Sequence, residues 1–117
     1  MGLSKAEIER KLKQMIGNPL FDAARMDDVG LMQGALDRGR SLNEQGPGSG
    51  FTPLHTAALN GSLRFLEEAL KIKHVDPWIR DNKGMLAIDH AEVRRDRAAM
   101  NLLFDAMYPN GQVRFSE

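Results

Sequence analysis

Apolar and polar positions along the chain recur with a period of 34 residues. Residues 52–58 read Thr-Pro-Leu-His-Thr-Ala-Ala, and the segments 18–24 and 86–92 keep both the large aliphatic residue and the alanine three positions after it. The apolar positions that follow also align in three sets, which are Leu31, Ala35 and Leu36, then Phe65, Ala69 and Leu70, then Ala99, Leu103 and Phe104. Three copies at one period indicate a repeat protein.

Each copy predicts two short helices. In the middle copy Thr52 is a good N-cap and Pro53 suits the first helical position, where its missing N–H costs nothing. The sequence 60–62, Asn-Gly-Ser, ends this helix, and we expect the Ser62 side chain to cap the next one, over 63–71. Polar, turn-rich segments at 43–50 and 76–84 separate the copies and favour hairpin-like turns.

Residues 3–16 predict a further helix before the repeats. Ser4 and Glu7 have the spacing of a capping box. A single apolar stripe follows, made by Ile8, Leu12, Met15 and Ile16. We interpret this helix as a cap over the exposed core edge of the first copy. The alternative is a helix that binds a partner or a membrane surface, but four bases against two acids in residues 1–17 are few for a lipid headgroup surface.

The middle copy resembles the signature of ankyrin repeats. The motif is Thr-Pro-Leu-His-Thr-Ala-Ala at 52–58, followed by Asn60-Gly61. The segment 75–77, Val-Asp-Pro, looks like the family's turn before its hairpin, and 81–84, Asp-Asn-Lys-Gly, looks like the hairpin end. The resemblance covers about residues 18–108 and is weaker in the outer copies, as is expected of terminal repeats that face water on one side.

This resemblance implies an all-α fold, an ankyrin-type α-solenoid of about three helix-turn-helix repeats with an N-terminal capping helix. The expected division is a capping helix at 1–17 and a repeat domain at 18–117, with repeats near 18–51, 52–85 and 86–108 and a short tail. It also implies that His55 is structural, its imidazole joining the Thr52 hydroxyl to a neighbouring backbone group. Asp89 stands at the same position in the third copy, which suggests a structural hydrogen bond there too.

Such a fold binds another protein through its hairpin tips and the exposed side of each first helix, acting as an inhibitor or adaptor and performing no catalysis. The positions expected to contact the partner vary between copies, and they are Glu44, Phe51, Thr56, Leu59, Asn60, Trp78, Arg80, Asn82 and Met85. By residue type, Trp78 and Arg80 are the expected hot spots. Trp78 has two interpretations, since it either packs against the next repeat or forms an exposed anchor.

Composition narrows the class of partner. Lys plus Arg equals Asp plus Glu, 16 against 16, which argues against nucleic acid, because backbone binding needs a basic surplus. The chain has no cysteine, so disulfides and thiolate metal sites are excluded. No apolar stretch approaches the roughly 20 residues of a membrane span, and the N-terminus lacks the apolar core of a signal peptide. We expect a cytoplasmic protein that does not bind membranes and is a monomer when free.

No residue pattern predicts a catalytic, cofactor or metal site. His55, His74 and His90 are separated by 19 and 16 residues and share no ligand spacing, so the sequence places no two of them together. Asp89 and His90 are adjacent on a predicted helix and point about 100° apart, too far to form one acid–base centre. The glycine-rich segment 46–50 lacks the Lys-Ser/Thr ending of a phosphate loop. The main alternative function is a structural subunit that self-assembles through the repeats or the N-terminal helix.

Overall fold

A computed structural model describes residues 2, 4–6 and 18–109. Its helices are α2 (Pro19–Met26), α3 (Val29–Asp37), α4 (Pro53–Asn60), α5 (Leu63–Ala69), α6 (Ala87–Arg94) and α7 (Arg97–Met107). The described residues contain no strand, which confirms the expected all-α repeat fold. Of the expected N-terminal helix, residues 5 and 6 are helical and 7–16 lie outside the described residues.

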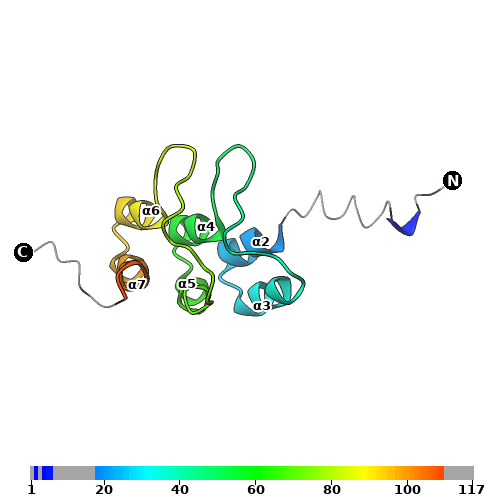
Figure 1. Cartoon of the computed structure of the whole chain (residues 1–117), viewed down its shortest axis with the longest axis horizontal. Helices are drawn as coiled ribbons and strands as arrows, with labels where there is room; N and C mark the ends of the chain where they lie inside the picture. The colour runs from blue at the N-terminus through cyan, green and yellow to red at the C-terminus, as the bar shows by residue number, and fades with distance from the viewer. Residues whose placement is uncertain (1, 3, 7–17, 110–117) are drawn as a thin grey trace, which may run out of the picture.

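The six helices form two layers of three. The first helices of the copies, α2, α4 and α6, lie in one layer, and the second helices, α3, α5 and α7, lie below them in Figure 1. Each pair packs against the next, and α4 packs against both α2 and α6. The 34-residue period is therefore a period of structure, in which each copy adds one helix to each layer.

The three copies begin their first helices with different caps. Asn18 accepts a hydrogen bond from the Leu20 N–H (2.9 Å), and Thr52 accepts one from the His55 N–H (3.3 Å). Leu86 has no side-chain acceptor for this purpose. There the Asp89 carboxylate accepts from the Leu86 N–H (2.8 Å), which confirms the structural hydrogen bond expected at Asp89. A capping box has two such hydrogen bonds, and the third copy has only the one in which the side chain of the third helical residue accepts from the N–H of the cap residue.

The turn within each copy uses the left-handed backbone region at the same register. Asp27, Gly61 and Arg95, spaced 34 residues apart, have φ values of 56°, 68° and 60°. Glycine suits this conformation because it has no Cβ. Asp27, which is not glycine, adopts this conformation and makes a contact from it, because its carboxylate accepts a hydrogen bond from the Phe65 N–H (2.7 Å) at the start of α5. The first repeat therefore caps a helix of the second.

This contact explains why the expected role of Ser62 was wrong. Ser62 stands at the N-cap of α5, yet its side chain makes no capping hydrogen bond. Its hydroxyl instead donates to the carbonyl of Ala24 in α2, and Asp27 serves the α5 amide. Sequence spacing within one copy could not show this exchange, because both partners come from the preceding copy.

The core lies between the layers and between neighbouring repeats. The aligned Leu20 and Leu54 of the first helices are 0% and 1% exposed, and Phe65 of α5 is 0% exposed. Small residues in between, namely Ala23, Ala57 and Ala91, are also fully buried and let adjacent helices approach closely. Leu70 is half-buried at the edge of this core. The aliphatic and alanine positions that repeat in the sequence are thus the packed ones.

Candidate protein-binding face

Two loops project from the layer of first helices on the same side of the molecule (Figure 1). We call residues 46–51 hairpin 1 and residues 80–85 hairpin 2. In hairpin 1 the Gly46 N–H donates to the Phe51 carbonyl (2.8 Å), and in hairpin 2 the Asp81 N–H donates to the Met85 carbonyl (2.9 Å). Each loop reverses the chain direction, and hairpin 1 leads into α4 while hairpin 2 leads into α6.

The two hairpins are joined to each other. Asn82 donates its backbone N–H to the Ser49 carbonyl (2.9 Å) and its side-chain amide to the Gly48 carbonyl. Gln45 donates from Nε2 to the carbonyls of Gly50 (2.9 Å) and Arg80 (3.0 Å). Gly50 is needed at this contact, because its φ is +73° and a Cβ would lie 2.9 Å from the Asn82 backbone nitrogen. The loops therefore form one connected surface.

His55 ties the middle repeat to hairpin 2. Its Nδ1 accepts the Thr52 N–H (3.0 Å) and lies 2.8 Å from the Thr52 hydroxyl. Because Nδ1 is an acceptor, the proton of the neutral ring sits on Nε2, which donates to the Met85 carbonyl (2.9 Å). These contacts confirm the structural role that the family resemblance implied for His55, and they lie inside the protein, where His55 is 1% exposed.

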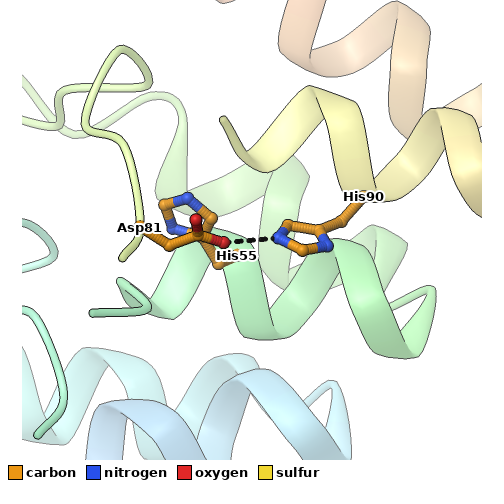
Figure 2. A group of neighbouring side chains, drawn as sticks. All are labelled: His55, Asp81 and His90. Atoms are coloured by element: carbon orange, nitrogen blue, oxygen red, sulfur yellow. Dashed lines mark hydrogen bonds and ion pairs between the residues drawn. The ribbon is translucent and has the colours of Figure 1, made fainter. Parts of the chain in front are cut away.

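A second buried histidine lies beside the first, contrary to expectation. The ring centroids of His55 and His90 are 5.6 Å apart, although nothing in the sequence spacing placed them together. His90 Nε2 donates to the Asp81 carboxylate (2.8 Å), as Figure 2 shows, and Phe51 contacts both imidazoles. The other carboxylate oxygen of Asp81 accepts the N–H groups of Lys83 and Met85, each at 2.9 Å. Hairpin 2 is thus closed around a buried carboxylate.

Residues 20–70 match the family model described as ankyrin repeats (many copies). This segment belongs to the ankyrin-repeat family. The match spans the helix pairs of the first two repeats, and α6 and α7, which lie beyond it, repeat the arrangement of α4 and α5. No curated protein matches the chain. Ankyrin repeats are generally protein–protein interaction modules and are typically not catalytic.

The buried cluster beneath hairpin 2 has the residue types of a metal site. Potential ligand atoms of His55, Asp81 and His90 lie within 4.8 Å of one another. Each is already committed: Nδ1 of His55 to Thr52, its Nε2 to Met85, and the Asp81 carboxylate to three N–H donors. A metal ion would have to displace several of these hydrogen bonds. The geometry is that of a hydrogen-bond network that holds the hairpin.

The electrostatics of this network favour a neutral His55 and an ionised Asp81. Burial lowers the pKa of His55 below its usual 6.5, outweighing the hydrogen bond to Met85. Burial alone would raise the pKa of Asp81, but the hydrogen bonds from His90 and from the Met85 and Lys83 amides outweigh it. They lower the Asp81 pKa from 3.8 to about 2.

We expect the stability of the fold to fall on acidification in two stages. A group with a lowered pKa in the folded state stabilises the fold above its unfolded pKa and loses that contribution as the pH falls through the folded value. His55 should therefore begin to lose its contribution below pH 6.5, and Asp81 between its unfolded pKa of 3.8 and about 2. Urea unfolding across this range, with His55→Gln as the comparison, should show a flatter profile near pH 6 in the variant. Identical profiles would contradict the assignment.

The expected partner-binding residues of α4 differ in their exposure to solvent. Leu59 (37% exposed) and Asn60 lie on the surface at the end of α4, whereas Thr56 is 8% exposed. Phe51 is half-buried and stacks on His55 with the ring planes 7° apart. Only the end of α4 therefore offers side chains directly to a partner.

Several of the expected hairpin residues hold the hairpins together. Arg80 donates to the Gly84 carbonyl (2.7 Å), Asn82 binds hairpin 1, and the half-buried Met85 receives His55 on its carbonyl. Glu44 accepts from the Asn18 amide (2.6 Å) and the Ser41 N–H (2.9 Å) and pairs with Arg40. Arg80 and Asn82 remain exposed, so they combine a structural contact with an accessible surface.

Trp78 packs against the third repeat, and its role as an anchor for a partner stays a prediction. Its ring meets Tyr108, after the end of α7, edge to face at 5.4 Å, so it packs against the third repeat. It is nevertheless 44% exposed. Because Tyr108 follows α7, this contact lies at the C-terminal end of the described repeats.

Sequence reasoning missed two exposed positions on the first helices. Val93 of α6 is 75% exposed and Arg25 of α2 has a side chain 54% exposed. Both are the 34-residue equivalents of Leu59, so the period that identified Leu59 was sufficient to find them. The same register makes His90 the equivalent of Thr56, and both are buried.

Proposed function

We propose that this protein is a non-catalytic binding module that recognises one partner protein through its hairpin tips and the exposed ends of α4 and α6. It acts as an inhibitor or adaptor by covering a surface of that partner. The match of residues 20–70 to ankyrin repeats supports protein binding. The exposed side chains on α4 and α6 support the choice of this face as the binding surface.

The observation that carries this proposal is an exposed aliphatic pair. Leu59 and Val93 occupy equivalent positions on neighbouring helices and are 37% and 75% exposed. Arg94, next to Val93, donates to the Leu59 carbonyl (3.1 Å), which fixes the ends of α4 and α6 beside each other. Adjacent exposed aliphatic groups on a rigid frame are typical of a protein-binding surface.

We expect the double variant Leu59→Asp with Val93→Asp to weaken partner binding more than about tenfold, which is about 1.4 kcal/mol. Two carboxylates would have to be desolvated where the partner buries apolar surface. The partner is first captured from the cell extract, and its affinity is then measured by titration calorimetry.

The matched control is Arg64→Ala with Glu67→Ala on α5, in the other helix layer. This control should bind normally, and both double variants should keep the melting temperature of the parent protein, since all four side chains are exposed. If the α5 pair abolishes binding and the Leu59 and Val93 pair does not, the interface lies on the second helices. Arg80 and Asn82 are poorer test sites, because their loss also loosens the hairpins.

A second candidate is self-assembly through the C-terminal end of the repeats. Trp78, Tyr108 and Phe104 form a chain of aromatic contacts there, with ring centroids 5.4 Å and 4.8 Å apart, and Trp78 is exposed. Sedimentation over a wide range of protein concentration separates the two functions. A mass that rises with concentration supports assembly, and a constant monomer mass supports the binding module.

A further inference from the structure

A pocket lies beside hairpin 1, and three of the residues expected to contact the partner, Glu44, Phe51 and Thr56, are among those that line it. It has a volume of about 510 Å³, and its walls come from α2, hairpin 1 and the segment that precedes hairpin 1. Two half-buried aromatic rings, Phe21 and Phe51, line it together with two arginines, Arg25 and Arg40. The pocket is therefore part apolar and part cationic.

Each arginine is held by a carboxylate of its own chain. Arg25 pairs with Asp22, three residues before it on α2, and Arg40 pairs with Glu44 at 3.0 Å. These pairs fix the guanidinium groups without burying them, because the side chains of Arg25 and Arg40 are 54% and 40% exposed. Their partners are more covered, with Asp22 at 15% and Glu44 at 32%.

The balance of donors and acceptors in the pocket favours a ligand that accepts hydrogen bonds. A guanidinium has five N–H donors, and each of these arginines uses few of them on its carboxylate. Of the two carboxylates in the lining, Glu44 already accepts from Asn18, Ser41 and Arg40, which fills most of its roughly four acceptor positions, whereas Asp22 accepts from Arg25. The two guanidinium groups therefore have more donors to spare than the two carboxylates have acceptor positions. Arginine also binds carboxylates in a two-pronged geometry, for which both guanidinium groups have donors to spare.

From this arrangement we infer that the pocket binds an acidic segment of the partner protein, with a carboxylate between Arg25 and Arg40 and a neighbouring apolar side chain against Phe21 and Phe51. This inference deepens the proposed function and rests on it. Arg25 is the equivalent on α2 of Leu59 and Val93, so the row along the first helices begins with a cation and continues with two aliphatic groups. The partner thus presents its acidic end to the first repeat.

The test uses nuclear magnetic resonance of the isotope-labelled full chain titrated with a capped pentapeptide, Ser-Phe-Glu-Phe-Ser. We expect saturable shifts of amide signals in α2 and hairpin 1. The matched peptide with Gln in place of Glu has the same shape without the charge. It should bind about fivefold more weakly, the size expected for losing one partly exposed ionic contact.

Variants of the protein test whether the two arginines bind the carboxylate of the Glu peptide. Arg25→Gln and Arg40→Gln should each reduce the preference for the Glu peptide, and Arg64→Gln on α5 is the matched control that should preserve it. All three side chains are exposed, and melting temperatures equal to that of the parent protein would show that the folds are intact.

Three outcomes would overturn the inference. The Glu and Gln peptides could bind equally, or the preference could survive in both arginine variants. Thirdly, the amide signals of the pocket could stay unchanged when the peptide is added. If they change on dilution of the protein instead, the occupant is a second copy of the chain, and if they change on substitution within residues 1–17, it is the chain's own N-terminal segment. None of these outcomes touches the proposed function, which stands or falls on the Leu59 and Val93 variant.

Discussion

Leu54→Ala is expected to lower the free energy of unfolding by about 2–5 kcal/mol, the usual cost of truncating a buried leucine. Leu54 is 1% exposed and lies in α4, which packs against both α2 and α6. A cavity there weakens two interfaces between repeats at once. In an array of so few repeats those interfaces are a large share of the total stability.

Leu59→Ala on the same helix is the matched control for this substitution. The chemical change is identical, but Leu59 is 37% exposed and faces away from the core. Its loss should change the free energy of unfolding by no more than about 0.5 kcal/mol, as is usual for surface positions. Urea unfolding followed by circular dichroism measures both. Similar losses from the two variants would show that the register of α4 is wrong.

His55→Ala is expected to cost about 1–3 kcal/mol, because it leaves buried polar groups without a partner. The Thr52 N–H would lose its acceptor, and the Met85 carbonyl would keep only the Asp81 N–H of its two donors. The ring also stacks on Phe51 and contacts His90, so its removal opens the packing beneath hairpin 2. The loss should be visible in thermal unfolding and as faster hydrogen exchange in residues 80–85.

His74→Ala provides the comparison, since His74 is exposed and takes part in the fold through its backbone carbonyl, which accepts from Asn43 (2.8 Å). That backbone contact survives the substitution, so stability should be unchanged. Metal analysis of the parent protein and of His55→Ala adds an independent check. A stoichiometric ion that is present in the parent and lost in the variant would overturn the structural role of His55.

Periodicity predicted the fold because burial repeats with it. Leu20 and Leu54, and the alanines that follow them, are buried at the same register, and one copy with a clear cap sufficed to place the others. The contacts between copies were harder to predict. The exchange of roles between Ser62 and Asp27 joins residues whose partners lie 38 positions away, and such pairs leave no mark in the pattern of a single copy.

The candidate site was predicted in its position and less well in its details. Leu59 and Asn60 are exposed as expected, but Thr56, which was expected on the same surface, is 8% exposed. The pairing of His90 with Asp81 depends on how hairpin 2 folds over α6, and spacing along the chain contains no information on that. Arg25 and Val93 could have been found, since each lies one period from Leu59.

The hydrogen bonds that join the two hairpins also bear on the thermodynamics of recognition. Asn82 and Gln45 connect the loops to each other, and His55 connects the second loop to α4, so the loops are ordered when the chain folds. A partner that binds them does not have to immobilise two independent loops. The conformational entropy that association normally loses at flexible loops is then smaller, and a modest contact area can give useful affinity.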